Sequence, residues 1–460
     1  MPAAVIAAGF VSTAQQMPSE TVAAVAVIWI DPPQLIDNPP LSISCWRRSL
    51  ASEPIMTEFV EKTYQPLGMA AIMRHAFSGE SMLPLSDKII AHLNTWQEDA
   101  NAMMDLSMIL QMTGHHDVGM AMLNQALSLQ QVFTPIPARP GQLRVTVFMA
   151  AGDLMANTPI ELLVENSDIA LTFVYIGENI PVVKDLPPCD LMFTAVGHAP
   201  ENAAVLSRLA QTLGHYPHAH DIVNHPERIA MLARDSASKL LRDIPGLIMP
   251  PTVLAQRHVL TVIAAGEQRL EMVSPGVDFP VIIRPANSHA GKDLERIDAA
   301  PELAAYLAVV QADDFYIAPF IDYSSADGQF RKYRVILVEG RPFLAHVGIS
   351  SHWMVHYLNA GMAENAEKRT EEARTMESFG TGFSLRHGAA LAAVAERTQL
   401  AYVGVDCAET REGKLLIFEV DSNMVVHDLD SPELYPYKHA HMQKLFSAFE
   451  GMLKARSQSR

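Results

Sequence analysis

The pattern of apolar and polar positions separates a helical part of the chain from a mixed part. Between about residues 50 and 133, apolar residues recur at steps of three and four, the period of an amphipathic helix. The stretch Ala100–Leu129 predicts two antiparallel helices on either side of Gly114. Its repeating apolar positions are Leu106, Leu110, Met120, Leu123, Ala126 and Leu127.

The pattern changes after the proline-rich segment Thr134–Gly141, where we expect a domain boundary. Beyond it, short β-rich runs alternate with helical runs, and this order predicts a small parallel sheet. The predicted strands and helices are Leu143–Met149, Ile160–Glu165, Ile169–Ile176, Leu191–Val196 and Glu201–Leu213. No G-x-G-x-x-G pattern follows the first strand, so the sequence lacks a dinucleotide-binding fingerprint.

From about Asn224 onward, strands and helices are again mixed. The predicted elements are a helix His225–Leu241, strands Val281–Ile283, Asp314–Ile317, Lys332–Glu339 and Pro342–Val347, a charged, solvated helix within 359–378, a helix Gly388–Thr398, a hairpin Val403–Val420 and a helix His439–Lys454. We therefore expect an α+β or α/β fold in four parts. These are an N-terminal extension (1–48), a helical domain (49–138), a small α/β domain (141–222) and a larger C-terminal domain (223–456).

Charge and composition limit which partners and which cellular environment we expect for this chain. The chain has 51 acidic and 34 basic residues, a net charge of −17, and such a surface repels nucleic acid. Cys45, Cys189 and Cys407 are too few for a disulfide framework and lack metal-ligand spacing, which favours a reducing cytoplasm. No run of about 18 apolar residues escapes charge or proline, and no basic residue precedes Arg47, so neither a membrane span nor a secretory signal is expected.

The helical part resembles a single tetratricopeptide repeat. Gly114, Gly119 and the pair Ala126-Leu127 stand where such a repeat has its turn glycine, its small packing residue and its Ala-Leu. One copy cannot build the stacked superhelix that repeats use to bind partners. An ordinary helical hairpin packed on the next domain is therefore favoured, and binding of a protein partner is the alternative.

Three carboxylates lie on the predicted C-terminal hairpin. A two-residue turn at Glu412-Gly413 would place Asp406 opposite Glu419, with Asp421 on the same face as Glu419. Like charges crowded on an apolar hairpin are tolerated when a hard cation lies among them. We expect Mg²⁺ there, and a solvated acidic edge is the alternative.

Basic and polar groups upstream suit phosphate. Strand alternation puts Lys332 and Arg334 on one face. Arg284 ends an apolar strand, where a charge is costly unless an anion meets it. The loop Asn287–Lys292 has small residues whose backbone N–H groups suit a phosphate chain.

In this order, these segments resemble the ATP-grasp superfamily from about Leu143 to Met452. The resemblance is to the branch with ribosomal-protein glutamate ligase and glutathione synthetase, with D-alanine ligase more distant. It also includes the Pro-x-Thr step at Pro250-Pro251-Thr252 and the Arg-Pro step at Arg284-Pro285. It implies a small βα pre-domain followed by two subdomains that hold ATP between two sheets.

The resemblance also implies roles for individual residues. Arg284 and Arg334 would be catalytic at the transferred phosphate, and Asp406, Glu419 and Asp421 would bind two Mg²⁺ ions. The implied nucleotide-binding residues are Arg284, Ser288, His289, Lys292, Ala318, Phe320, Asp322, Lys332 and Arg334.

Two positions depart from the family pattern. Asp421 replaces the usual Asn, and the nearby Asn423 could take over part of its role. The usual first phosphate lysine is missing, and either Arg234 or Lys239 would replace it.

The implied function is an ATP-dependent carbon–nitrogen ligase. It would join a small-molecule or peptide carboxylate to an amine through an acyl phosphate, releasing ADP and phosphate. Ser350–Tyr357 would shape the acceptor pocket, and Arg386 with His387 would bind a substrate carboxylate; core or surface roles are the alternatives. Homodimers are usual among the enzymes it resembles.

Two other functions stay open. One is a kinase that stops at phosphoryl transfer, because the same nucleotide site would serve it. The other is a non-catalytic repeat scaffold with a degenerate ATP site, against which the three retained carboxylates argue.

Overall fold

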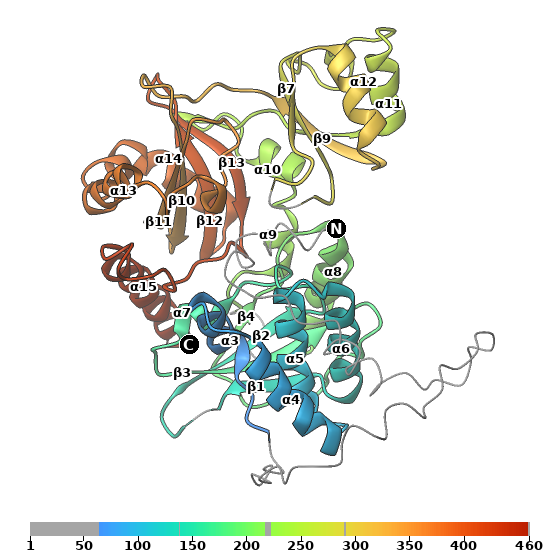
Figure 1. Cartoon of the computed structure of the whole chain (residues 1–460), viewed down its shortest axis with the longest axis vertical. Helices are drawn as coiled ribbons and strands as arrows, with labels where there is room; N and C mark the ends of the chain where they lie inside the picture. Colours follow the sequence, from blue (N-terminus) through green and yellow to red (C-terminus); the bar gives the residue numbers. More distant parts are fainter. Residues whose placement is uncertain (1–63, 138, 217–221, 289–290, 459–460) are drawn as a thin grey trace, which may run out of the picture.

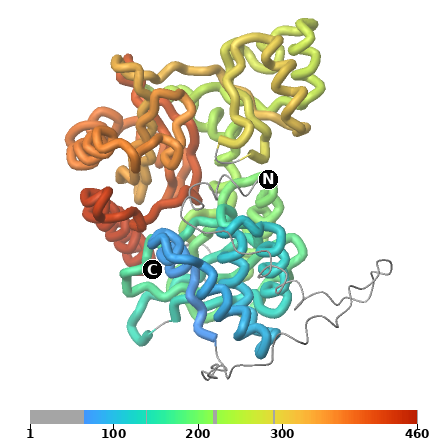
Figure 2. The backbone as a smooth tube through the Cα atoms, viewed as in Figure 1, coloured from blue at the N-terminus to red at the C-terminus, as the bar shows by residue number. Residues whose placement is uncertain are grey.

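The computed structural model describes residues 64–137, 139–216, 222–288 and 291–458. The expected N-terminal extension 1–48, the start of the helical domain up to residue 63, and Cys45 lie outside the described residues. The described part has the expected α+β class, with N-terminal helices followed by three separate sheets (Figure 1). Figure 2 traces the chain from the helices through the small sheet into two further lobes, each built on one of the other two sheets.

The helical part contains four helices. They are α3 (Gly68–Phe77), α4 (Leu83–Thr95), α5 (Ala100–Met112) and α6 (His116–Leu129). The predicted pair within Ala100–Leu129 is confirmed as α5 and α6. Gly114 has a φ of +86° in the turn between them, a conformation that glycine adopts at little cost. Gly119 lets the helices approach closely, since a Cβ there would lie 2.7 Å from Cγ of Gln111.

The predicted parallel strands are confirmed in the small sheet, whose order is β1-β3-β2-β4. The strands are β1 (Val132–Ile136), β2 (Leu143–Ala150), β3 (Ile169–Ile176) and β4 (Leu191–Thr194), with helices α7 (Ile160–Val164) and α8 (Ala203–Leu213). β1 was not expected. It pairs antiparallel with β3, and the register shifts between Phe133 and Ile136, across a proline that lacks an N–H. The proline-rich segment thus contributes an edge strand, and the expected boundary falls inside this sheet.

Two further sheets make up the C-terminal part. The smaller one has the order β6-β9-β7-β8 and the larger one the order β11-β10-β12-β13-β5. The smaller sheet comprises β6 (Val253–Gln256), β7 (Val281–Pro285), β8 (Glu295–Ile297) and β9 (Asp314–Pro319), with α11 (Arg257–Ala264) and α12 (Ala300–Val309). The larger comprises β5 (Leu247–Ile248), β10 (Phe330–Val338), β11 (Arg341–Ser350), β12 (Tyr402–Glu409) and β13 (Leu415–Asp421), with α13 (Ala366–Ser378), α14 (Phe383–Thr398) and α15 (Lys438–Gln458).

Two predicted helices differ in the structure. The helix expected at His225–Leu241 is divided into α9 (Pro226–Ala230) and α10 (Arg234–Leu240). The charged helix α13 is not simply a solvated face, because its Glu372 is fully buried and accepts a hydrogen bond from the Val347 amide at 2.9 Å. The other charged residues of the helix hid that one inward-facing carboxylate in the sequence pattern.

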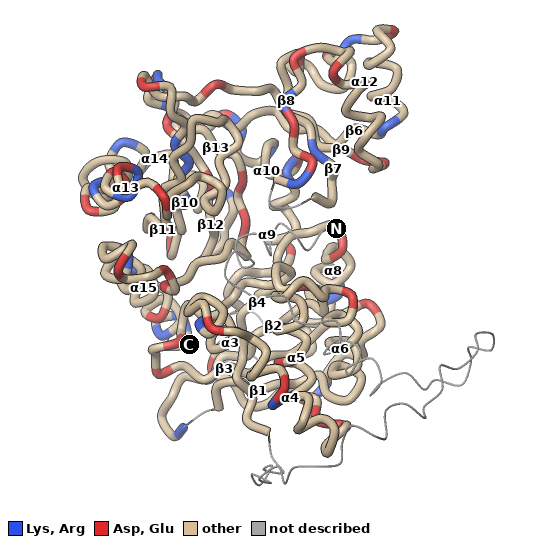
Figure 3. Tube along the Cα trace, viewed as in Figure 1, with Lys and Arg blue, Asp and Glu red and all other residues tan. Residues whose placement is uncertain are grey.

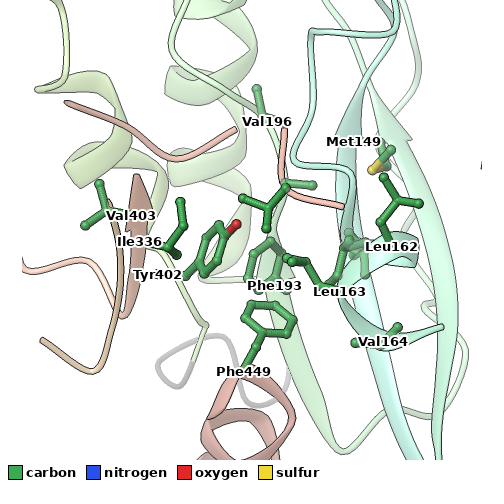
Figure 4. Close-up of a cluster of buried hydrophobic side chains, with 14 of the residues drawn as sticks. Met149, Leu162, Leu163, Val164, Phe193, Val196, Ile336, Tyr402, Val403 and Phe449 are labelled. Atoms are coloured by element: carbon green, nitrogen blue, oxygen red, sulfur yellow. The ribbon is translucent and has the colours of Figure 1, made fainter. Parts of the chain in front are cut away.

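A large hydrophobic core joins the helical part, the small sheet and the larger sheet. Figure 4 shows part of it, where the Phe449 ring lies 5.9 Å from that of Phe193 and 5.1 Å from that of Tyr402. The smaller sheet has a separate core around Val281, Phe315 and Ile317. The smaller lobe therefore packs as its own unit beside one large body. None of the described helices combines the length and apolarity needed to span a membrane.

Candidate active site

A cavity of about 1420 Å³ lies between the smaller and the larger sheet. It is lined by most of the residues that the sequence singled out: Arg284, Ser288, Lys292, Ala318, Phe320, Lys332, Arg334, Asp406, Glu419 and Asp421. Asp322 is not among the lining residues, and His289 lies outside the described residues. The two-sheet arrangement around one cavity is what the ATP-grasp resemblance implied.

The β12–β13 hairpin places Asp406 opposite Glu419, as predicted, but for a different reason. The turn is longer than two residues, because the Thr410 amide donates to the Lys414 carbonyl at 2.9 Å and Cys407 pairs with Ile417. A bulge at Phe418 then restores the register. Without that extra residue, Asp406 would face Phe418.

Asp406 is buried against two cations. Its carboxylate accepts two hydrogen bonds from the Arg334 guanidinium, at 2.9 and 3.0 Å, and lies 2.7 Å from the Lys332 ammonium. Burial alone would raise the pKa of Asp406, but Arg334 and Lys332 hold it far below its usual value. The predicted face shared by Lys332 and Arg334 is confirmed, since Arg334 pairs directly with Asp406 across β10 and β12. Figure 3 colours the basic and acidic positions along the chain, including those of the larger sheet.

The expected trio of carboxylates does not form one cluster. The described ranges contain no group of three His, Cys, Asp or Glu side chains placed to hold a metal ion. The physical reason is that the Asp406 carboxylate is taken up by Arg334 and Lys332. Glu419 and Asp421 remain as a pair on one face of β13.

Glu419 and Asp421 are close enough for their charges to interact. Burial and the charge of Glu419 raise the pKa of Asp421 to about 7. Burial also acts on Glu419, but Arg234 and Arg284 outweigh it and lower the pKa of that carboxyl. Two adjacent carboxylates that face a cavity and resist joint ionisation fit a divalent cation, which favours both charged forms. The residues present therefore suit Mg²⁺ at Glu419 and Asp421.

Arg284 of β7 and Arg234 of α10 both line the cavity close to Glu419. Arg284 is 9% exposed and donates from Nε to the Ser288 hydroxyl at 3.0 Å. Burial and the charge of Arg234 lower the pKa of Arg284 to about 9. Arg234 forms an ion pair with Glu419. Two neighbouring guanidinium groups that line a cavity are of the kind that binds a multiply charged anion.

The structure also decides between Arg234 and Lys239. Arg234 lines the cavity at the start of α10. Lys239 instead pairs with Asp235 at 3.1 Å, and its side chain is 67% exposed. Arg234 is therefore the basic residue of this segment that faces the site.

Ala318, Phe320 and Asp322, which the resemblance implied for nucleotide binding, lie at the end of β9 and just beyond it. The Phe320 amide donates to the Pro280 carbonyl at 2.9 Å, so that N–H is not free to bind a ligand. The centre of the Phe320 ring lies 4.2 Å from the Arg296 guanidinium and 5.6 Å from the centre of the Trp353 ring, which it meets edge to face. Asp322 accepts from the Ser324 amide at 2.8 Å, a bond that lowers its pKa, and it stabilises a local turn instead of lining the cavity.

Of the residues expected to contact the acceptor, Ser350 and 352–357 line the cavity, whereas Arg386 and His387 do not. Both bind Glu409 at 2.7 Å. Their expected role as a carboxylate site is therefore corrected to an ion-pair cluster outside the cavity. Glu409 saturates them, a contact between α14 and β12 that sequence spacing does not reveal.

Sequence reasoning missed Lys438. Its ammonium is buried at the cavity edge, 2.8 Å from Asp430 and 2.5 Å from the Tyr357 hydroxyl, and it lies 4.2 Å from the centre of the Tyr357 ring. The signal present in the sequence is a lysine directly after Tyr435-Pro436-Tyr437, since aromatic rings favour a nearby cation.

No protein-family model matches this chain, and no curated protein matches it. Among the solved structures that are similar to it are the following three. A RimK domain protein ATP-grasp from Sphaerobacter thermophilus DSM 20745 has 16% identity and a TM-score of 0.41, over 68% of this chain and 99% of that one. The VanG D-Ala:D-Ser ligase from Enterococcus faecalis has 14% identity and a TM-score of 0.40, over 68% and 99%. The D-alanine-D-alanine ligase from Coxiella burnetii has 10% identity and a TM-score of 0.40, over 69% and 96%. The chemistry of the site rests on this chain's own residues.

Proposed function

We propose that this chain is an ATP-dependent carboxylate–amine ligase, which forms an amide bond and releases ADP and phosphate. The observation that carries the proposal is one cavity between two sheets, where Arg284 of the smaller lobe and Arg234 of α10 lie near a carboxylate pair on the larger sheet. Such a site neutralises a polyphosphate from two sides, which is most of what phosphoryl transfer requires of a protein.

The basic residues would bind the phosphate chain of ATP. Arg284 and Arg234 would contact it from one side, and Lys292, which also lines the cavity, would contact it from the loop after β7. Arg334 is fixed by its two bonds to Asp406 and by a bond of 3.2 Å to the Val425 carbonyl. A guanidinium held in this way is preorganised to stabilise charge that develops on the transferred phosphoryl group.

The carboxylates would hold Mg²⁺. Glu419 and Asp421 are the two ligands that the structure supports, and Asp406 is a further oxygen donor of the same hairpin. When bound, Mg²⁺ neutralises phosphate oxygens.

The remaining chemistry needs positioning more than covalent help. The γ-phosphoryl group of ATP would pass to the carboxylate substrate, and the amine would then displace phosphate from the acyl carbon. Cys407 takes no part, because it is fully buried and burial raises the pKa of its thiol. A ligase therefore explains the site without a nucleophilic side chain.

The direct test is ADP release with MgATP and a panel of carboxylates, with and without amines. A ligase releases ADP only when acid and amine are both present. Amine-independent release with a phosphorylated product would assign a kinase, and ATP binding without release would assign the scaffold. The matched variant is Glu419→Gln, which keeps side-chain volume and should reduce turnover by at least 100-fold. Normal turnover in that variant would contradict the proposed role of Glu419.

A further inference from the structure

The cavity is larger than a single ligand requires. Its volume of about 1420 Å³ exceeds the range of about 300–1,000 Å³ that is typical for one small-molecule site. The basic residues assigned to ATP account for the end between the two sheets. The other end is walled by loops that follow β2, β3 and β4, at the carboxyl ends of the parallel strands.

The N-terminal helices complete that second end. His116, Met120 and Asn124 line the cavity at steps of four residues and therefore share one face of α6. Phe77, the last residue of α3, lines it as well. The helical part is thus a wall of the same cavity that contains Arg334 and Glu419.

The helical wall contacts the segment that follows β13. The Phe77 ring lies 4.9 Å from the ring of His427, which follows β13 and also lines the cavity. Close by, the Asn423 side chain donates to the Met155 carbonyl at 2.6 Å, which ties the loop after β2 to the same segment.

Buried carboxylates fix α3 in place. Asp105 of α5 accepts from the Leu67 amide at 2.6 Å, and Glu161 of α7 accepts from the Ala70 amide at 2.9 Å. The helix that ends at Phe77 is therefore held by contacts from two neighbouring helices. The wall is part of the packed body and is formed before any ligand binds.

The two ends of the cavity differ in charge. Among the described lining residues, those from the helical part and the small-sheet loops include no Lys or Arg, but they include Asp153, Glu178 and Glu201. The basic residues assigned to ATP lie at the other end, and Lys438, which also lines the cavity, is paired with Asp430. A substrate with an anionic reacting end and a cationic remote end matches this distribution.

We propose that α6 and the end of α3 determine substrate specificity by binding the remote part of an elongated substrate, namely a short peptide with a free N-terminal amine. Its carboxylate lies at the reaction centre, an apolar side chain contacts Phe77 and Met120, and its amine lies toward Asp153 and Glu178. The assignment of the reacting end rests on the proposed ligase function. The wall itself does not.

The test compares peptide binding with turnover. The probes are the free amino acids X, the dipeptides Leu-X and the tripeptides Lys-Leu-X, each with a free or an acetylated N-terminus. Binding is measured as the ligand-induced rise in Tm in the presence of MgADP, and turnover as ADP release. Met120→Trp would fill the part of the cavity beside α6. Ala121→Trp, at an exposed neighbouring position of the same helix, is the control.

We expect the tripeptides with a free amine to bind the wild-type protein at least tenfold more tightly than the amino acids. Met120→Trp should lose that advantage, Ala121→Trp should keep it, and the affinity for MgATP should be equal in all three proteins. Asn124→Arg, at an exposed position that lines the cavity, is a second variant, which adds a positive charge instead of an aromatic ring. It should weaken the free tripeptides at least threefold more than the acetylated ones, because it adds a like charge near the amine.

The inference is overturned if no tripeptide binds better than its amino acid, or if both tryptophan variants behave alike. Tight peptide binding without any ADP release would contradict the ligase function, but it would agree with the proposed peptide-binding role of α6 and α3. If amino acids cause ADP release and Met120→Trp does not change it, the ligase function is supported. The proposed role of α6 in substrate specificity is then contradicted.

Discussion

At the scale of single residues, the site depends on how buried charges are compensated. Asp406 is 1% exposed, and its neighbours Lys332 and Arg334 are about one fifth exposed. Breaking such a pair leaves charges without partners, which costs more than the intact pair contributes. Asp406 therefore contributes to the stability of the fold, in addition to any role in binding a ligand.

Asp406→Asn tests this compensation. It should lower the free energy of unfolding by about 2–3 kcal/mol at pH 7, because Lys332 and Arg334 lose their counter-charge. The pKa of Asp406 is depressed in the folded state, so its stabilisation is present above about pH 4 and is lost as pH falls further. Urea unfolding at pH 7 and pH 3 should show a smaller difference between the two proteins at pH 3. A constant difference would contradict the pairing.

Asp421 should behave in the opposite way. Its pKa of about 7 is raised above that of an unfolded aspartate, so its contribution to stability falls as pH rises from about 4 to about 7. Without added metal, Asp421→Asn should therefore raise the Tm by roughly 2–4 °C at pH 8 and leave it unchanged at pH 4. Thermal unfolding at the two pH values decides this. Equal shifts at both would show that Glu419 and Asp421 do not repel one another.

At the scale of elements, strands and helices were predictable where local pattern determines them. The Ala100–Leu129 helices, the parallel strands and the C-terminal hairpin follow the periodicity of their apolar residues. The edge strand β1 and the division between α9 and α10 do not, since they depend on contacts made elsewhere. The hairpin shows how two differences can cancel. The turn is longer than predicted, which shifts the register by one residue, and the bulge at Phe418 shifts it back, so that Asp406 still lies opposite Glu419.

Two helix-interior glycines provide an element-scale prediction. A Cβ at Gly119 would lie 2.7 Å from Cγ of Gln111 and 3.0 Å from the Ser107 carbonyl, so Gly119→Ala should separate α5 from α6 and cost about 1–3 kcal/mol. A Cβ at Gly451 in α15 would meet no neighbouring side chain within 4 Å, so Gly451→Ala should stabilise by about 0.5–1 kcal/mol. Chemical denaturation compares them. Stabilisation by both substitutions would mean that α5 and α6 do not need this close approach.

At the scale of the whole molecule, the net charge of −17 conceals a cavity with a basic end. The sequence predicted most residues of that end, because a buried arginine before a proline and alternating cations on a strand are local features. It did not predict that Asp406 would pair with cations across β10, that Arg386 and His387 would pair with Glu409, or that α6 would reach the cavity. Those contacts join segments far apart in the chain and arise only when the sheets and helices pack.

The central claim is that the space between the two sheets binds MgATP through Arg284 of the smaller lobe and the neighbouring Arg234 of α10. Calorimetric titration with MgATP of the wild-type protein and of Arg284→Met tests it most directly. Both proteins should unfold at similar temperatures, because Met retains much of the length of the side chain and removes a buried charge. We predict saturable binding to the wild type and at least tenfold weaker binding to Arg284→Met. Equal affinities in the two proteins, or no binding to the wild type, would contradict the account.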